Sequence, residues 1–224
     1  MTQFKESELK KLLHFVGYGN RNAPFWFVGM EERGSKKRLR RRLKFRRFED
    51  LKRAHKILGI KDYHWTKSKL QPTWKRMCWL MLALNHQNFD DNQLVLDYQA
   101  ERLGRKKDET FLLELMPLPA KNLKSWDLHE LFKSRSEYKR KVRPKRIKLL
   151  NRLLRKHQPE KVVICYGRWW GRHKEIFENA DFHSTGKFAV AKTEYGLIIL
   201  CDHLTMIGTE KLMEMQEIIE ANKG

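Results

Sequence analysis

FWFVGMEERGS, residues 25–35, begins with a short apolar run that is followed by two acids, Glu31 and Glu32. Three further runs share this apolar character: FLLEL at 111–115, VVICY at 162–166 and LIILC at 197–201. Runs of this length and composition are typical of strands buried on both faces of a parallel sheet. We therefore predict strands at 25–30, 110–115, 161–166, 188–192 and 197–201.

Helical patterns lie between these strands. Apolar residues recur at helical spacing over seven segments, which are 6–16, 36–58, 74–86, 92–102, 139–156, 168–179 and 209–220. Strands that alternate with helices predict a three-layer α/β/α sandwich with a short, mainly parallel central sheet and right-handed crossovers. The stretch 33–105 is too long for one crossover. We expect it to be a basic helical insertion on a single domain that spans 1–224.

The charge of the chain points to a polyanionic partner. The 224 residues include 48 Lys and Arg against 27 Asp and Glu, a net charge of +21. Ten of the fifteen residues from 33 to 47 are basic, and a second basic block covers 133–156. Basic amphipathic helices can be solvated faces or can bind acidic lipids. The density of charge in two separate blocks favours nucleic acid, although phosphate binding by itself specifies no reaction.

Composition excludes several other classes of protein. No run of 18 apolar residues occurs, so we expect no membrane association, and 1–15 lacks the continuous apolar stretch of a signal peptide. The three cysteines, Cys78, Cys165 and Cys201, form neither a disulfide framework nor a zinc or iron–sulfur spacing. We expect a cytoplasmic monomer without metal or cofactor.

Chemically competent residues follow the predicted strands. Glu31 and Glu32 come after the first strand, and Glu114 lies near the end of the second. Arg168 follows the third strand, and His203 follows the last one. Ligands of open parallel sheets bind outside the carboxyl ends of the strands. Acids and a histidine at that edge, beside a basic surface, predict a reaction centre.

Four segments together resemble the uracil-DNA glycosylase superfamily, over the chain from about Pro24 to its end. The segment FWFVGMEERGS (25–35) is similar to the family's GMNPG loop, with acids in place of Asn and Pro. The segment IILCDHLTMIG (198–208) is similar to its HPSP loop, with the histidine retained. ETFLLELMPLP (109–119) resembles the strand that ends in a base-reading Asn, and EKVVICYGRWW (160–170) resembles the next strand and its glycine.

The resemblance implies a DNA glycosylase that rotates a nucleotide out of the helix and hydrolyses its N-glycosidic bond, leaving an abasic site. Glu31 would orient or deprotonate water and stabilise the sugar cation, and His203 would donate a hydrogen bond to the departing base. Met206 and Ile207 fall where the family inserts an apolar wedge into the base stack. The implied DNA contacts are Arg33, Lys36, Lys37, Arg38, Arg40, Arg41, Arg42, Arg168, Thr205, Met206 and Ile207.

Base recognition falls to Glu114, with Glu32 beside it. An ionised glutamate can only accept hydrogen bonds, so it suits the N4 amine of cytosine better than O4 of uracil. We therefore hypothesise a modified cytosine, such as the hydroxymethylated or glucosylated base of some phage DNA, as the target. Excision of such a base would serve antiviral defence without harm to a host that lacks it.

Each of these residues also has a structural interpretation. Glu31 and Glu32 could be acids at a helix start, and Glu114 could pair with an arginine of the insertion. The aromatic residues Trp74, Trp79, Trp169 and Trp170 favour core packing over stacking on bases, as do Phe45 and Phe48. Two other functions stay open. One is a non-catalytic nucleic-acid-binding module on a degenerate glycosylase scaffold, and the other is a metal-free nuclease using Glu31 and His203.

Overall fold

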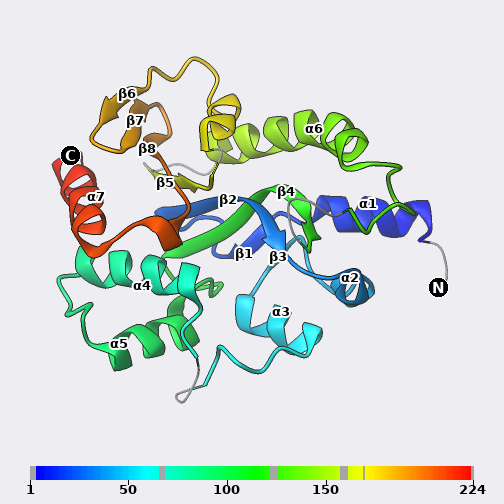
Figure 1. Cartoon of the computed structure of the whole chain (residues 1–224), viewed down its shortest axis with the longest axis horizontal. Coiled ribbons are helices and arrows are strands. Elements are labelled where there is room, and N and C mark those ends of the chain that lie inside the picture. Colours follow the sequence, from blue (N-terminus) through cyan, green and yellow to red (C-terminus); the bar gives the residue numbers. More distant parts are fainter. Residues whose placement is uncertain (1–3, 66–68, 122–125, 157–160, 169, 223–224) are drawn as a thin grey trace.

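The computed structural model describes residues 4–65, 69–121, 126–156, 161–168 and 170–222, and it is an α/β fold around one twisted sheet (Figure 1). Within these residues the sheet has eight strands in the order β3-β1-β4-β2-β5-β8-β7-β6. The strand segments predicted from the apolar runs are confirmed. They are β2 (Phe25–Arg33), β4 (Thr110–Ala120), β5 (Lys161–Tyr166), β7 (Phe188–Thr193) and β8 (Gly196–Cys201).

The prediction of a short, mainly parallel sheet was wrong in its detail. Four neighbouring strands, β4, β2, β5 and β8, do run parallel. Three antiparallel pairs flank them: β7 with β8, β6 (His183–Thr185) with β7, and β1 (Gly17–Gly19) with β4. The sheet is therefore mixed and long. The strands that extend it were missed because two or three residues are too few to show a period.

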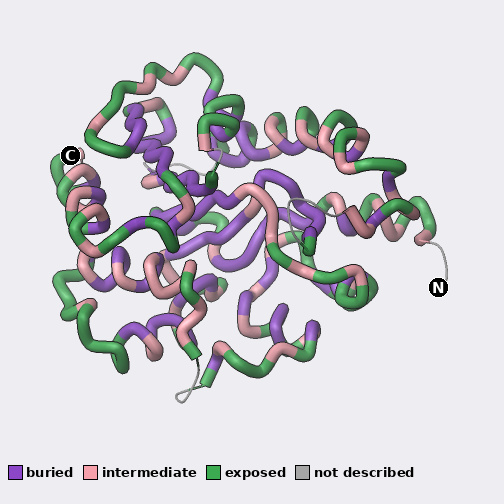
Figure 2. The backbone as a smooth tube through the Cα atoms, viewed as in Figure 1, coloured by how far each residue is buried: buried purple, intermediate pink, exposed green. Residues whose placement is uncertain are grey.

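Helices cover both faces of the sheet, and the strands between them are buried (Figure 2). On one face, Leu150, Leu153 and Leu154 of α6 (Arg135–Lys156) pack against the sheet residues Val163 and Ile198. The other face packs against α3 (Leu51–Leu58), α4 (Pro72–Leu84) and α7 (Thr209–Ala221). A third cluster joins α1 (Glu6–His14) to α2 (Lys36–Arg42) and α6.

The stretch 33–105 adds a strand to the sheet as well as helices. The single helix predicted over 36–58 is divided into α2 and α3, because Phe45 turns into the core and β3 (Phe48–Glu49) pairs in parallel with β1. Asp50 then starts α3, where its side chain accepts a hydrogen bond from the Arg53 amide. α5 (Asn92–Asp97) and a π-helical turn, η1 (Tyr98–Arg102), complete the segment.

The predicted aromatic core residues are packed as expected where they are described. Trp74 stacks on His55 with ring centroids 5.2 Å apart, and Trp79 and Trp170 are partly buried against the two sheet faces. Trp169 lies outside the described residues. The predicted helix at 168–179 is a shorter 3₁₀ segment, η2 (Trp170–Ile176), and a 3₁₀ turn, η3 (Leu204–Met206), precedes α7. None of the described helices has the length and apolar character needed to cross a membrane.

Candidate active site

Three of the predicted acids lie at the carboxyl edge of the parallel strands. Glu31 and Glu32 belong to the last part of β2, and Glu114 lies within β4, paired in register with Gly29. Both strands run further than the sequence predicted, so Glu31 and Glu32 lie within β2 and not after it, and Glu114 lies well before the end of β4. The electrostatic influence of Glu31 and Glu32 reaches Glu114, so the three carboxyl groups form one acid cluster.

Glu114 folds its carboxylate over the backbone of Gly29. A Cβ atom added to Gly29 would lie 2.2 Å from Oε2 and 2.7 Å from Oε1 of Glu114. Burial raises the pKa of Glu114 well above its usual range, and the charges of Glu32 and Glu31 raise it further. No ion pair joins this carboxylate to another described residue. Burial and the neighbouring acids thus favour the neutral form of Glu114, against the opposing charges of Arg146 and Arg42. The neutral form can donate as well as accept a hydrogen bond.

Glu31 is fixed through one oxygen only. Its Oε2 accepts a 2.6 Å hydrogen bond from Nη1 of Arg135, at the start of α6, and its side chain is 9% exposed. Its Oε1 is buried and has no hydrogen-bond donor among the described residues. Burial raises the pKa of Glu31, while Arg135 and Lys139 act in the opposite direction. The chain thus holds one carboxylate oxygen in place and leaves the other as an unused acceptor.

Glu32 forms a structural ion pair with a residue that the sequence assigned to DNA. Its Oε2 accepts hydrogen bonds from Nη1 of Arg42 at 2.8 Å and from the Tyr18 hydroxyl at 2.9 Å. The Arg42 side chain is only 4% exposed. Burial alone would lower the pKa of Arg42, but Glu32 and Tyr18 outweigh it and raise the pKa. The predicted DNA contact of Arg42 is therefore wrong for this fold, because its guanidinium is buried in the ion pair with Glu32.

His203 lies after β8, beside the acid cluster but not in contact with its carboxylates. Its ring packs against Tyr166 at the end of β5, with centroids 5.8 Å apart, and Tyr166 in turn feels the charges of Glu114 and Glu32. Nδ1 of His203 lies 2.8 Å from the Thr205 hydroxyl and 3.3 Å from its amide nitrogen. Because Nδ1 accepts from that amide, the ring proton is favoured on Nε2. Burial lowers the pKa of His203, so the neutral ring offers Nε2–H as a donor.

The loop after His203 corrects the predicted wedge. Ile207 is 3% exposed and packs in the core, so its side chain does not reach a DNA surface in this conformation. Met206, at 75% exposure, is the apolar side chain that projects outward, and Thr205 is also exposed. The sequence alone could not say which of the two neighbours faces inward, because the 3₁₀ turn over Leu204–Met206 determines it.

The remaining predicted DNA contacts lie mainly on exposed surface. Lys36 is paired with Glu130 at 2.7 Å, and Nη1 of Arg41 donates to the Leu58 carbonyl at 2.7 Å. Arg40 lies 3.5 Å from Glu8. Six of the predicted contacts are exposed: Arg33, Lys37, Arg38, Arg40, Arg41 and Arg168.

Three residues of the site were not predicted. Arg135 and Tyr166 contact Glu31 and His203 directly, and His173 lies beneath the site with Nε2 3.3 Å from the Gly29 carbonyl. Burial lowers the pKa of His173 to about 4, so it stays neutral. Arg135 was one of many basic residues in its block, and only the docking of α6 distinguishes it. Tyr166 is the last residue of an apolar strand, and this position at the carboxyl edge of the sheet was the only sign in the sequence that it could belong to the site.

The acid cluster has no arrangement suited to a metal ion: among the described residues, no three His, Cys, Asp or Glu side chains are placed to hold one. Neither the cavity beside Phe48 nor the small one beside Trp79 is lined by these acids. A scan against models of known protein families and a search of curated proteins find no match to this chain.

The position of Glu114 predicts a coupling with Gly29. Gly29→Ala should lower the free energy of unfolding by about 1–3 kcal/mol, because the new methyl group overlaps the Glu114 carboxylate. In a Glu114→Ala background the same change should cost much less. Urea denaturation of the four proteins in this double-mutant cycle measures the coupling. Equal costs of Gly29→Ala in both backgrounds would contradict the geometry.

The burial of Arg42 predicts a second effect on stability. Arg42→Gln should lower the free energy of unfolding by about 3 kcal/mol, because it leaves Glu32 charged without its cation. Lys37→Gln is the matched control in the same helix, since Lys37 is exposed, and should change stability by less than about 0.5 kcal/mol. Thermal and urea unfolding compare the two variants. A similar small effect for both would show that Arg42 is not the internal partner of Glu32.

Proposed function

We propose that the protein is a DNA glycosylase, a divergent member of the uracil-DNA glycosylase superfamily, which flips a base and hydrolyses its N-glycosidic bond. The observation that carries this proposal is the state of Glu31. One of its oxygens is held by Arg135 and the other is a buried acceptor without a donor. Such a carboxylate is oriented to accept a proton from water. Because that oxygen is covered, admission of water and sugar requires a movement of neighbouring side chains when DNA binds.

The other groups supply complementary parts of the reaction. Nε2–H of His203 would donate to the departing base as negative charge develops on it, since Thr205 occupies Nδ1. Met206 would enter the base stack, replacing Ile207 in that role. The exposed cations of α2, with Arg33 and Arg168, would contact the phosphate backbone.

Glu114 would read the base, by a mechanism that differs from the one expected of an ionised acid. In its neutral form, the hydroxyl donates to N3 of cytosine while the carbonyl oxygen accepts from the N4 amine. A neutral carboxyl group can also pair with N3–H and O4 of uracil. Discrimination against uracil therefore requires contacts to a substituent on the cytosine ring. A modified cytosine, such as that of phage DNA, remains our proposed target.

A second candidate is a non-catalytic nucleic-acid-binding module on the same scaffold. It is favoured by the ion pairs of Glu31 with Arg135 and of Glu32 with Arg42, which are also what a purely structural network would contain. It differs from the first proposal in one measurable respect. Its binding and biological effect would survive the loss of Glu31 and His203 as proton-handling groups.

The direct test is release of free base from duplex and single-stranded DNA carrying cytosine, uracil, 5-hydroxymethylcytosine or its glucosylated form. We expect alkali-labile sites on a modified substrate, together with a free base detected by mass spectrometry. Glu31→Gln should slow excision about 100-fold or more, as loss of a general base does. His203→Ala should slow it as well.

Glu217→Gln provides the control, since Glu217 is an exposed acid on α7, away from the candidate site. Melting temperatures verify that each variant is folded. Breaks without alkali would instead indicate a nuclease. DNA that stays intact on every substrate, with binding unchanged in Glu31→Gln and His203→Ala, would replace the proposal with the binding module.

The raised pKa of Glu114 predicts that base recognition weakens as pH rises. Below that pKa the neutral acid donates one hydrogen bond and accepts another; above it the carboxylate can only accept, and its second oxygen faces N3 of cytosine or O4 of uracil, which are acceptors too. Excision of a cytosine-type base should therefore slow as pH increases through the pKa of Glu114. Glu114→Gln, which always carries a donor and an acceptor, should abolish this dependence. Rates measured from pH 5 to 9 test it, and an identical pH profile in both proteins would contradict it.

A further inference from the structure

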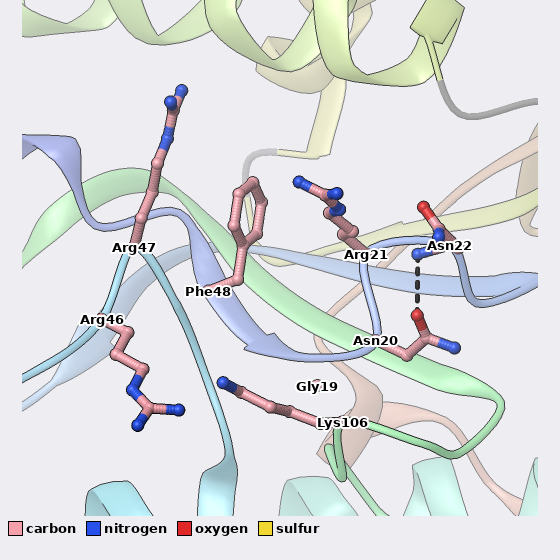
Figure 3. Close-up of a pocket in the computed structure, with 8 residues that line it drawn as sticks. All are labelled: Gly19, Asn20, Arg21, Asn22, Arg46, Arg47, Phe48 and Lys106. Carbon is pink, nitrogen blue, oxygen red and sulfur yellow. Dashed lines mark hydrogen bonds between the residues drawn. The ribbon is translucent and has the colours of Figure 1, made fainter.

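A cavity of about 390 Å³ lies on the outer part of the sheet, away from the acid cluster. Its walls come from three places in the chain: the link between β1 and β2 (19–22), the residues 46–48 at the start of β3, and Lys106 ahead of β4. Figure 3 shows Arg21 and Arg47 rising on either side of Phe48, with Arg46 and Lys106 below them. A cavity of this volume falls in the size range of small-ligand sites.

Four cationic side chains line this cavity, and no salt bridge joins them to an acid of the described residues. Arg21, Arg46, Arg47 and Lys106 are all exposed. The nearest acids already have partners of their own. Glu49 and Asp50 pair with Arg53 and Arg105, and Asp108 pairs with Arg102. Such a group of like charges is unfavourable by itself and is relieved by an anion.

Phe48 gives the cavity an aromatic wall. The guanidinium carbons of Arg21 and Arg47 lie 5.3 Å and 5.6 Å from the centre of its ring, and the ring is anchored against Phe111 at 6.1 Å. Guanidinium groups so placed can contact phosphate oxygens while the ring or the guanidinium plane stacks on a base. Asn20 is held by the Asp108 carbonyl and the Asn22 amide, so this wall is ordered before any ligand binds.

We propose that this cavity is a second nucleic-acid site, which binds one nucleotide through its phosphate group, with Arg21, Arg47 and Lys106 on the phosphate and Phe48 beside the base. The chemistry is that of a phosphate ester, whether the ester belongs to a strand or to a free nucleotide. The site uses residues outside the acid cluster. It does not depend on base excision, because its ligand needs no target base.

The test measures binding of thymidine monophosphate, inorganic phosphate and a 12-nucleotide thymidine strand by titration calorimetry. Arg21→Gln with Arg47→Gln should weaken thymidine monophosphate or the strand about tenfold or more, as expected from losing charge-assisted hydrogen bonds. Lys187→Gln with Lys192→Gln is the matched control, because it removes two exposed charges that lie outside both basic blocks, one next to β7 and one within it. This control should keep wild-type affinity at the cavity.

The same variants separate the outcomes. Without ligand, the Arg21 and Arg47 double variant should melt at or above the wild-type temperature, since two like charges are removed; Lys106→Gln offers an independent variant. Tight binding of the mononucleotide would identify a free nucleotide as ligand, and tight binding of the strand alone would identify strand phosphates. Equal affinities of wild type and both cavity variants would overturn the proposal, and so would inorganic phosphate binding as tightly as the nucleotide. Excision by a cavity variant is a separate readout, so failure here leaves the glycosylase assay unaffected.

Discussion

The buried guanidinium of Arg146 is the constraint on which the carboxyl edge of the sheet depends. It is 3% exposed and donates to the carbonyl oxygens of Phe15, Val16 and Glu114, at 2.6–3.2 Å. It thereby ties α6 and the approach to β1 onto β4, at the residue that carries the central carboxyl group. Burial lowers the pKa of Arg146 to about 10, but the group stays charged at neutral pH. A buried cation satisfied by carbonyls keeps a positive field beneath the acids.

Each of the three acids is compensated in its own way, which explains how they can share one small volume. Arg135 compensates Glu31, Arg42 compensates Glu32, and Glu114 has its pKa raised until the neutral form is favoured. If all three carboxyl groups were ionised and unpaired, their mutual repulsion in a buried setting would oppose folding. The ion pairs are thus part of the fold, and in the proposed reaction they would also be part of the chemistry. The contact that holds Glu31 Oε2 leaves Oε1 as the oxygen that would accept a proton.

The sequence was informative wherever a residue's role depended on its own segment. The central strands could be predicted because four apolar runs of strand length require a buried environment. The parallel direction of β2, β5 and β8 could be predicted as well, because helical segments lie between the strands. The short strands β1 and β3 carry no such pattern, since they form only when the rest of the sheet is present. It was harder still to predict which side chains face the core. The burial of Arg42 in a run of ten basic residues, and of Ile207 beside exposed Met206, is decided by which face a helix or turn presents to the core.

These compensations also bear on how a basic protein could bring DNA to a cluster of acids. From the sequence, three carboxylates at the mouth of a basic surface should repel phosphate. In the folded chain the surroundings of Glu114 favour its neutral form, and Arg135 and Arg42 offset the charges of the other two acids. A phosphate backbone that approached Arg33 or Lys37 would therefore meet less repulsion from the acids than their number suggests. The acids of the proposed active site can be retained for chemistry without forfeiting the attraction that the remaining charge provides.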